Sequence, residues 1–175
     1  LKTFAYPDFG LYIWRSSRFF MSVRCGPIGQ NGNGGHAHND QLAIELNIGG
    51  EDWIADPGAY LYTSSPEERN AYRSVHAHSA PKIGAGEPSR LDLGLFRLED
   101  NCKARCLVFN KAEQRDLKFF LFFGLQFPKK PSARGTPIEL PHPKIINFIL
   151  KLTKKKVIKI GSCDFYKFFF WNSFN

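Results

Sequence analysis

Several motifs that identify common enzyme or metal-binding classes are missing from this 175-residue chain. It has no His-Glu-x-x-His pattern, and its glycines form neither Gly-x-Gly-x-x-Gly nor a P-loop, so a zincin and a nucleotide site are excluded. The longest apolar run, Phe119 to Phe127, is too short to cross a bilayer of about 30 Å as a helix, and no signal peptide is visible. No Cys-x-x-Cys pair occurs, which argues against a zinc finger or a thioredoxin motif and favours buried free thiols. The cysteines are Cys25, Cys102, Cys106 and Cys163.

Acidic residues are scarce in the last part of the chain. Residues 111–175 hold 13 Lys+Arg against 4 Asp+Glu, whereas residues 1–110 hold 11 against 12, so the tail carries all of the net charge of +8. The tail also contains 11 of the 17 Phe. This change predicts a domain over 1–110 and a basic, Phe/Lys-rich tail of unclear fold over 111–175, as a frame-shifted C-terminus would give.

The lysines at 154–156 lie in a tail without the interleaved aromatic and basic residues of a nucleic-acid site. We therefore expect neither nucleic acid nor a membrane as a partner. The chain begins at Leu1 and its only methionine is Met21, so we expect it to be a piece of a longer protein.

Short β-rich runs separated by turn residues predict an all-β fold with an antiparallel β-sandwich. In Gln41 to Ile48 apolar residues alternate with Ala, Glu and Asn, as expected of a strand with one face on a core. Gly49-Gly50-Glu51 then predicts a hairpin turn, with Asp52 to Asp56 as the returning strand. Ser65 to Glu68 resembles a brief capped helical turn. Further strands are expected over 11–15, 19–25, 74–83, 91–98 and 103–109.

Two histidines, His36 and His38, precede the alternating strand. Residues two apart in an extended segment project to the same side, and a closed hairpin would bring Asp56 back beside His38. Two imidazoles and a carboxylate are suitable ligands for zinc. A cupin site would need a Glu where Leu42 or Ala43 stands, so the cupin interpretation is disfavoured.

Three sequence blocks together resemble the heparinase II/III-like family of polysaccharide lyases, in its C-terminal β-sandwich domain. They are GQNGNGGHAHNDQLAIEL, DWIADPGAYLYT and RNAYRSVHAHSAP, which contain the family patterns G-H-x-H, D-P-G-x-Y and R-N-x-x-R-S-x-x-x-H in order. The resemblance covers roughly residues 6–109 and ends where the composition changes.

The resemblance implies a zinc ion held by His38, Asp56 and His78, and it places His36 in the active-site cleft. It leaves His76, in the second His-Ala-His, outside the site. A tyrosine of the loop, Tyr60, Tyr62 or Tyr72, can also contribute to catalysis, and of these Tyr62 is taken with His36 as a candidate catalytic residue. Arg69, Asn70 and Arg73 are candidate substrate-binding residues, since a guanidinium can hold a sugar carboxylate through two hydrogen bonds, although bracing of the loop explains them equally well.

The activity implied by the resemblance is β-elimination on an acidic, uronic-acid-containing polysaccharide, by a protein that is periplasmic or secreted in its intact form. The principal acid and base residues of the family lie on a preceding helical (α/α) toroid domain, which is missing here. We therefore expect a truncated lyase that does not turn over substrate by itself. The alternatives are a non-catalytic, zinc-stabilised carbohydrate-binding or structural β-sandwich module and, more distantly, an unrelated metal-dependent β-barrel enzyme.

Overall fold

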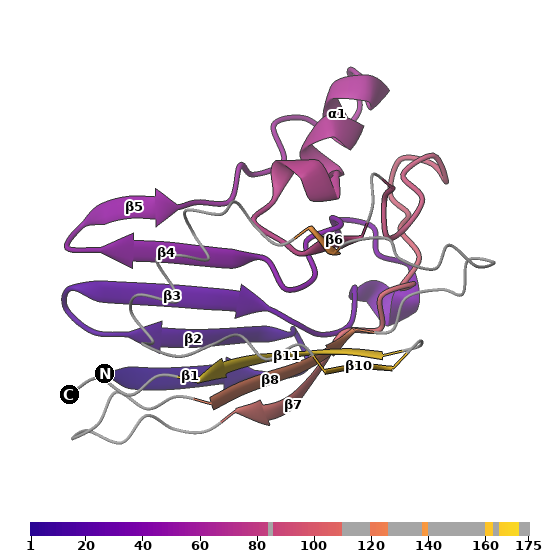
Figure 1. Cartoon of the computed structure of the whole chain (residues 1–175). Helices are drawn as coiled ribbons and strands as arrows, with labels where there is room; N and C mark the ends of the chain where they lie inside the picture. The colour runs from indigo at the N-terminus through magenta and orange to yellow at the C-terminus, as the bar shows by residue number, and fades with distance from the viewer. Residues whose placement is uncertain (84–85, 110–119, 126–137, 140–159, 163–164, 172–175) are drawn as a thin grey trace.

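The computed structural model describes residues 1–83, 86–109, 120–125, 138–139, 160–162 and 165–171, and its largest element is a five-stranded antiparallel sheet. The strands follow one another in chain order across this sheet, each paired with the next (Figure 1). They are β1 (Lys2–Tyr6), β2 (Leu11–Arg15), β3 (Phe19–Arg24), β4 (Ile44–Ile48) and β5 (Glu51–Ile54).

A second antiparallel sheet has the order β10-β11-β8-β7 and appears at the β1 side of the first sheet in Figure 1, where β8 and β11 overlap β1 in the view. Its strands are β7 (Arg105–Phe109), β8 (Phe120–Leu125), β10 (Ile160–Ser162) and β11 (Phe165–Trp171). A short pair joins β6 (Lys82–Ile83) to β9 (Ile138–Glu139). The lysines at 154–156 lie outside the described residues. The division at 110/111 stays a prediction.

The core forms where the two sheets face one another. In β2 the buried Tyr12 and Trp14 alternate with less buried neighbours, so one face of the strand points inward. The ring of Phe109 on β7 packs against both, with centroid distances of 5.1 Å to Tyr12 and 5.0 Å to Trp14. Ile44 and Leu46 on β4 are buried in the same cluster. The predicted all-β sandwich is confirmed.

The predicted hairpin is also present, although its strands are shorter than expected. Ile48 pairs with Glu51, which leaves Gly49 and Gly50 as a two-residue turn with φ angles of 65° and 94°. Positive φ at both central positions is the type I′ requirement, and glycine meets it without steric cost.

Beyond β5 the chain forms α1 (Pro66–Arg73), whose N-cap is Ser65, with Pro66 at the start of the helix. The helix is longer than the brief turn expected from sequence. Within the described part of the chain, no helix is long and apolar enough to cross a membrane. Two 3-10 turns, η1 (Gln30–Gly32) and η2 (Val75–Ala77), are the other helical elements of the described residues.

Two predicted strands are wrong. Over 74–83 the hydroxyl of Ser74 caps η2, so that only Lys82–Ile83 remain extended and paired. Residues 91–98 form no strand at all. Gly94 has a φ of 119°, outside strand geometry, and Leu98 is buried as a single apolar residue of an irregular loop.

Candidate functional site

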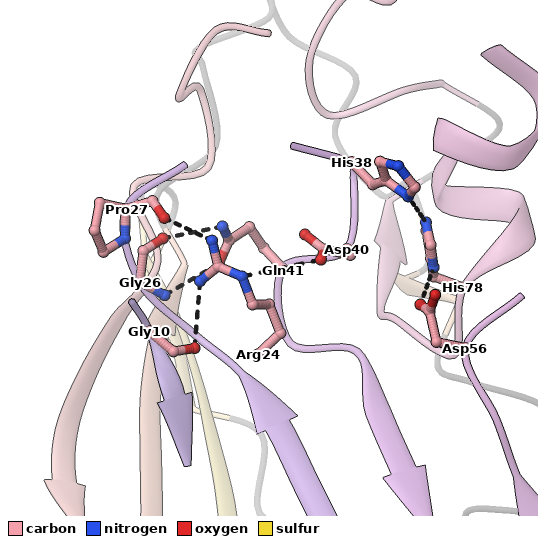
Figure 2. A network of polar contacts seen from close by, with 9 residues as sticks. All are labelled: Gly10, Arg24, Gly26, Pro27, His38, Asp40, Gln41, Asp56 and His78. Carbon is pink, nitrogen blue, oxygen red and sulfur yellow. Dashed lines mark hydrogen bonds and ion pairs between the residues drawn. The ribbon is translucent and has the colours of Figure 1, made fainter. Parts of the chain in front are cut away.

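The His36–His38 segment belongs to a long irregular loop between β3 and β4, whose two ends are held together by side-chain hydrogen bonds. The Gln41 side chain donates to the carbonyl of Gly26 (2.9 Å) and accepts from its amide (3.2 Å). Leu42 donates its backbone N–H to the carbonyl of Arg24 (2.7 Å). These contacts close the loop at the end of the sheet that α1 also occupies (Figures 1 and 2).

Arg24 reinforces the base of this loop. Its guanidinium donates to the carbonyls of Gly10 (3.2 Å) and Pro27 (2.6 Å), and its Nε lies 3.9 Å from Oδ2 of Asp40 (Figure 2). Burial raises the pKa of Asp40, and the charge of Arg24 opposes that rise. Because Asp40 lies two residues after His38, the ion pair helps to fix where the histidine segment leaves the sheet.

His38, His78 and Asp56 come from three different segments and form one chain of polar contacts (Figure 2). Nδ1 of His38 lies 3.3 Å from Nε2 of His78, and Nδ1 of His78 lies 2.8 Å from Oδ2 of Asp56. Burial and the neighbouring His78 lower the pKa of His38 to about 4, so its imidazole is neutral at pH 7. The hydrogen bond from His78 lowers the pKa of the Asp56 carboxyl.

The two facing nitrogens suit a zinc ion. Ligands about 2.0 to 2.1 Å from zinc in a tetrahedron are about 3.3 to 3.4 Å apart, which is the separation of His38 Nδ1 and His78 Nε2. Asp56 contacts the other nitrogen of His78, the position of a carboxylate that orients a metal-bound histidine. Across the described residues, no three His, Cys, Asp or Glu side chains converge on a common point where one ion would be held. The three-ligand set of His38, Asp56 and His78 therefore stays a prediction.

His36 is exposed and lies among aromatic rings. Its ring centroid is 5.4 Å from that of Tyr62, in an edge-to-face arrangement, and 5.3 Å from that of Phe96. Of the three loop tyrosines considered from sequence, Tyr62 is the one beside His36, whereas Tyr60 stacks on Tyr72 with a centroid distance of 5.2 Å.

A shallow pocket brings His36 together with His38, Tyr62, Arg69 and Arg73. Both arginines are buried, with 6% and 4% of their surface exposed. Arg69 donates hydrogen bonds to the carbonyl of Tyr62 and to Oδ1 of Asn70. Asn70 is thus a direct contact of Arg69.

Arg73 has an incomplete set of partners. It donates to the carbonyls of Ala37 (3.2 Å) and Arg97 (2.9 Å), while its buried Nη1 has no hydrogen-bond partner among the residues that the structure describes. Burial, together with the charge of Arg69, lowers the pKa of Arg73. Within the described ranges neither Arg69 nor Arg73 has a carboxylate at ion-pair distance. A pocket with two buried cations and no internal anion is suited to an anionic ligand.

The second His-Ala-His differs from the first. His76 is exposed, and its Nδ1 lies 3.3 Å from Nζ of Lys82. Its side chain is therefore outside the polar chain that Figure 2 shows.

The sequence model of the family described as "Heparinase II/III-like, C-terminal" matches residues 2–117. The chain belongs to this family. The resemblance seen in the three sequence blocks is thereby confirmed at family level, and a search of curated proteins finds no match.

Solved structures of heparinases share the fold of this heparinase II/III-like chain. A heparan sulfate lyase HepC mutant from Pedobacter heparinus has a TM-score of 0.54 and 22% identity over 75% of this chain and 19% of its own. The HepC lyase itself has a TM-score of 0.52 and 20% identity over 75% of this chain and 18% of its own. A structure titled Heparinase III has a TM-score of 0.52 and 15% identity over 70% of this chain and 18% of its own. The chain thus spans about a fifth of the length of these proteins.

Sequence reasoning missed two residues of the site. The ring of Phe96 contacts that of His36 from a loop sixty residues further along the chain. Glu87 accepts hydrogen bonds from Asn39, which follows His38, and from Val75, which precedes His78. Neither residue belongs to the three sequence blocks, and both lie in segments that form no strand or helix in the structure, so no local pattern indicated their contacts.

Proposed function

We propose that this chain supplies the zinc-binding part and one wall of the active-site cleft of a polysaccharide lyase, which cleaves uronic-acid-containing polysaccharide by β-elimination. The observation that carries the proposal is the pocket in which exposed His36 adjoins two buried arginines that have no carboxylate at ion-pair distance in the part of the chain that the structure describes. Family membership and the similar fold of proteins titled heparan sulfate lyase support the same reaction class.

The pocket meets two chemical needs of this reaction. In β-elimination a base removes the proton at C5 of the uronate, the bond from C4 to the glycosidic oxygen breaks, and a C4–C5 double bond forms. Negative charge develops on the uronate carboxylate, and cationic donors at that position lower the barrier. Arg69 and Arg73 would hold the carboxylate, a role supported by their burial in the pocket and by the Nη1 of Arg73, which has no hydrogen-bond partner among the described residues. His36 and Tyr62 adjoin that position and can exchange a proton with substrate.

Zinc is proposed as the cofactor, held by His38 and His78 with Asp56 as the third ligand or as the carboxylate that orients His78. Its contribution when bound is structural, because it joins the histidine loop to the segment after α1. The intact protein is proposed to act in the periplasm or outside the cell, with a preceding helical toroid domain that supplies the principal acid and base.

The lyase proposal is tested by joining this chain to the toroid domain of a family member and recording the ultraviolet absorbance of the unsaturated product. We expect the absorbance to grow when an acidic polysaccharide is added. In His36→Ala the rate of this growth should be lower by about a hundredfold or more. His76→Ala is the matched control and should keep full activity. Equal rates in the two variants would contradict the role of His36.

Oligosaccharide binding without any product would instead favour the alternative, a non-catalytic carbohydrate-binding or structural module stabilised by zinc. Metal analysis separates the zinc proposal from the lyase proposal. The chain should contain about one zinc ion, as expected of a structural site. His38→Ala should lose the ion while His76→Ala keeps it, and zinc retained in His38→Ala would overturn the ligand assignment.

A further inference from the structure

Glu87 lies outside the pocket, yet its carboxylate contacts both of the segments that carry His38 and His78. Oε2 accepts hydrogen bonds from Nδ2 of Asn39 (2.7 Å) and from the backbone N–H of Val75 (3.0 Å), and Oε1 accepts from the hydroxyl of Ser74. Asn39 directly follows His38, while Ser74 and Val75 begin the turn that ends at His78.

The first segment is held by loop contacts and side-chain hydrogen bonds, and not by a sheet. Around His38 the chain forms no sheet ladder, since it runs through the irregular loop that follows η1. Asn39 is 3% exposed, and besides Glu87 its side chain donates to the carbonyl of Ser89 (2.9 Å). Its backbone N–H donates to the carbonyl of Arg73 (2.9 Å). The contacts of Asn39, together with the bond from Arg73 to the carbonyl of Ala37 on the other side, therefore help to set the position of His38.

The second segment depends on Glu87 through Ser74. The Ser74 hydroxyl donates to Glu87 and accepts from the N–H of His76 (3.1 Å), which caps the 3-10 turn Val75–Ala77. His78 follows this turn and donates its N–H back to the carbonyl of Val75 (3.3 Å). Fixing Ser74 and Val75 thus fixes the start of the short turn that presents His78.

We propose that Glu87 is a positioning residue, which sets the separation of the His38 and His78 rings by binding both of their segments at once. A carboxylate suits the role because it has acceptor sites for three donors, and hydrogen bonds to an ionised acceptor are the stronger kind. A glutamine side chain has one acceptor oxygen and would turn an N–H group toward a donor.

The test compares Glu87→Gln with Glu99→Gln, the same chemical change at an exposed residue whose side chain accepts from Asn101. The centroids of the His38 and His78 rings are 5.2 Å apart. The nuclear Overhauser effect between these two rings is measured in isotopically labelled, metal-free protein. We expect the signal to be kept in Glu99→Gln and to fall severalfold in Glu87→Gln, with resonances of the buried Trp14 unchanged.

A second readout is zinc affinity, measured by competition with a chromophoric chelator. Only this readout rests on the proposed metal site, so a chain that binds no zinc would contradict that site and leave the ring measurement to decide on Glu87. Glu87→Gln should bind zinc about 10 to 100-fold more weakly than Glu99→Gln, as for other residues that orient ligands. Glu87→Asp keeps the charge but is one methylene shorter, and should weaken both signals to a smaller extent. Unchanged ring contact in both Glu87 variants, or loss of the whole fold in both, would overturn the positioning role.

Discussion

Replacing Arg73 with methionine should remove the affinity for an acidic sugar at little cost in stability. Arg73 makes two hydrogen bonds to carbonyl groups, and losing such bonds from a charged donor costs about 1.5 to 3 kcal/mol each. The change also removes a buried cation that no carboxylate balances, which returns several kcal/mol of desolvation free energy. Methionine keeps most of the apolar packing of the side chain. Since these terms oppose one another, the free energy of unfolding should fall by less than about 2 kcal/mol.

Arg24→Met is the matched control, because Arg24 is a largely buried arginine with a carboxylate beside it. The substitution leaves Asp40 without its cation and the carbonyls of Gly10 and Pro27 without their donor. Breaking a buried ion pair costs about 3 to 5 kcal/mol, and we expect the lower end here because both side chains are partly exposed.

Urea unfolding at pH 7, with linear extrapolation to water, measures both costs. The measurement is repeated with a uronic-acid oligosaccharide at about one hundred times its dissociation constant, where a single-site ligand adds about 2.7 kcal/mol. The wild-type chain and Arg24→Met should gain this increment, and Arg73→Met should gain none. A loss of more than about 4 kcal/mol in Arg73→Met, or a full ligand increment in that variant, would refute the anion-site argument.

Two further predictions concern stability. The folded pKa of His38 is about 4, below the unfolded value of 6.5, so the unfolded chain takes up the proton first and metal-free protein should lose up to about 3 kcal/mol between pH 6.5 and 4. Urea unfolding across this pH range should show that the free energy of unfolding changes less with pH in His38→Gln than in the wild-type chain. The same change with pH in both proteins would contradict the assignment of this pH dependence to His38. Trp14→Ala should cost about 3 to 5 kcal/mol because Trp14 is fully buried, whereas Trp53→Ala, at a side chain 55% exposed, should cost less than about 1 kcal/mol. Thermal unfolding compares the two, and equal losses would argue against the assigned core.

Much of the first sheet could be predicted from local patterns. Alternation in Gln41 to Ile48 gives the buried face of β4, and the glycine pair gives the turn to β5, because both signals are confined to a few adjacent residues. The same reasoning failed over 91–98, where apolar residues suggested a strand. A strand also needs a partner, and in the structure the backbone at Gly94, with a φ of 119°, is not extended.

The candidate site divides in a similar way between sequence and structure. By itself, the sequence determined the family and the residues that carry its motifs, including His36, His38 and His78, since these lie in compact blocks with characteristic spacing. The tertiary structure alone decided that Tyr62 and not Tyr60 adjoins His36. It also decided that Asp56 contacts Nδ1 of His78, the nitrogen that faces away from His38. The contacts of Glu87 with both histidine segments are likewise visible only in the structure. These contacts join irregular loops far apart in the chain. Their geometry depends on hydrogen bonds between loops, and such bonds leave no periodic trace in the amino-acid sequence.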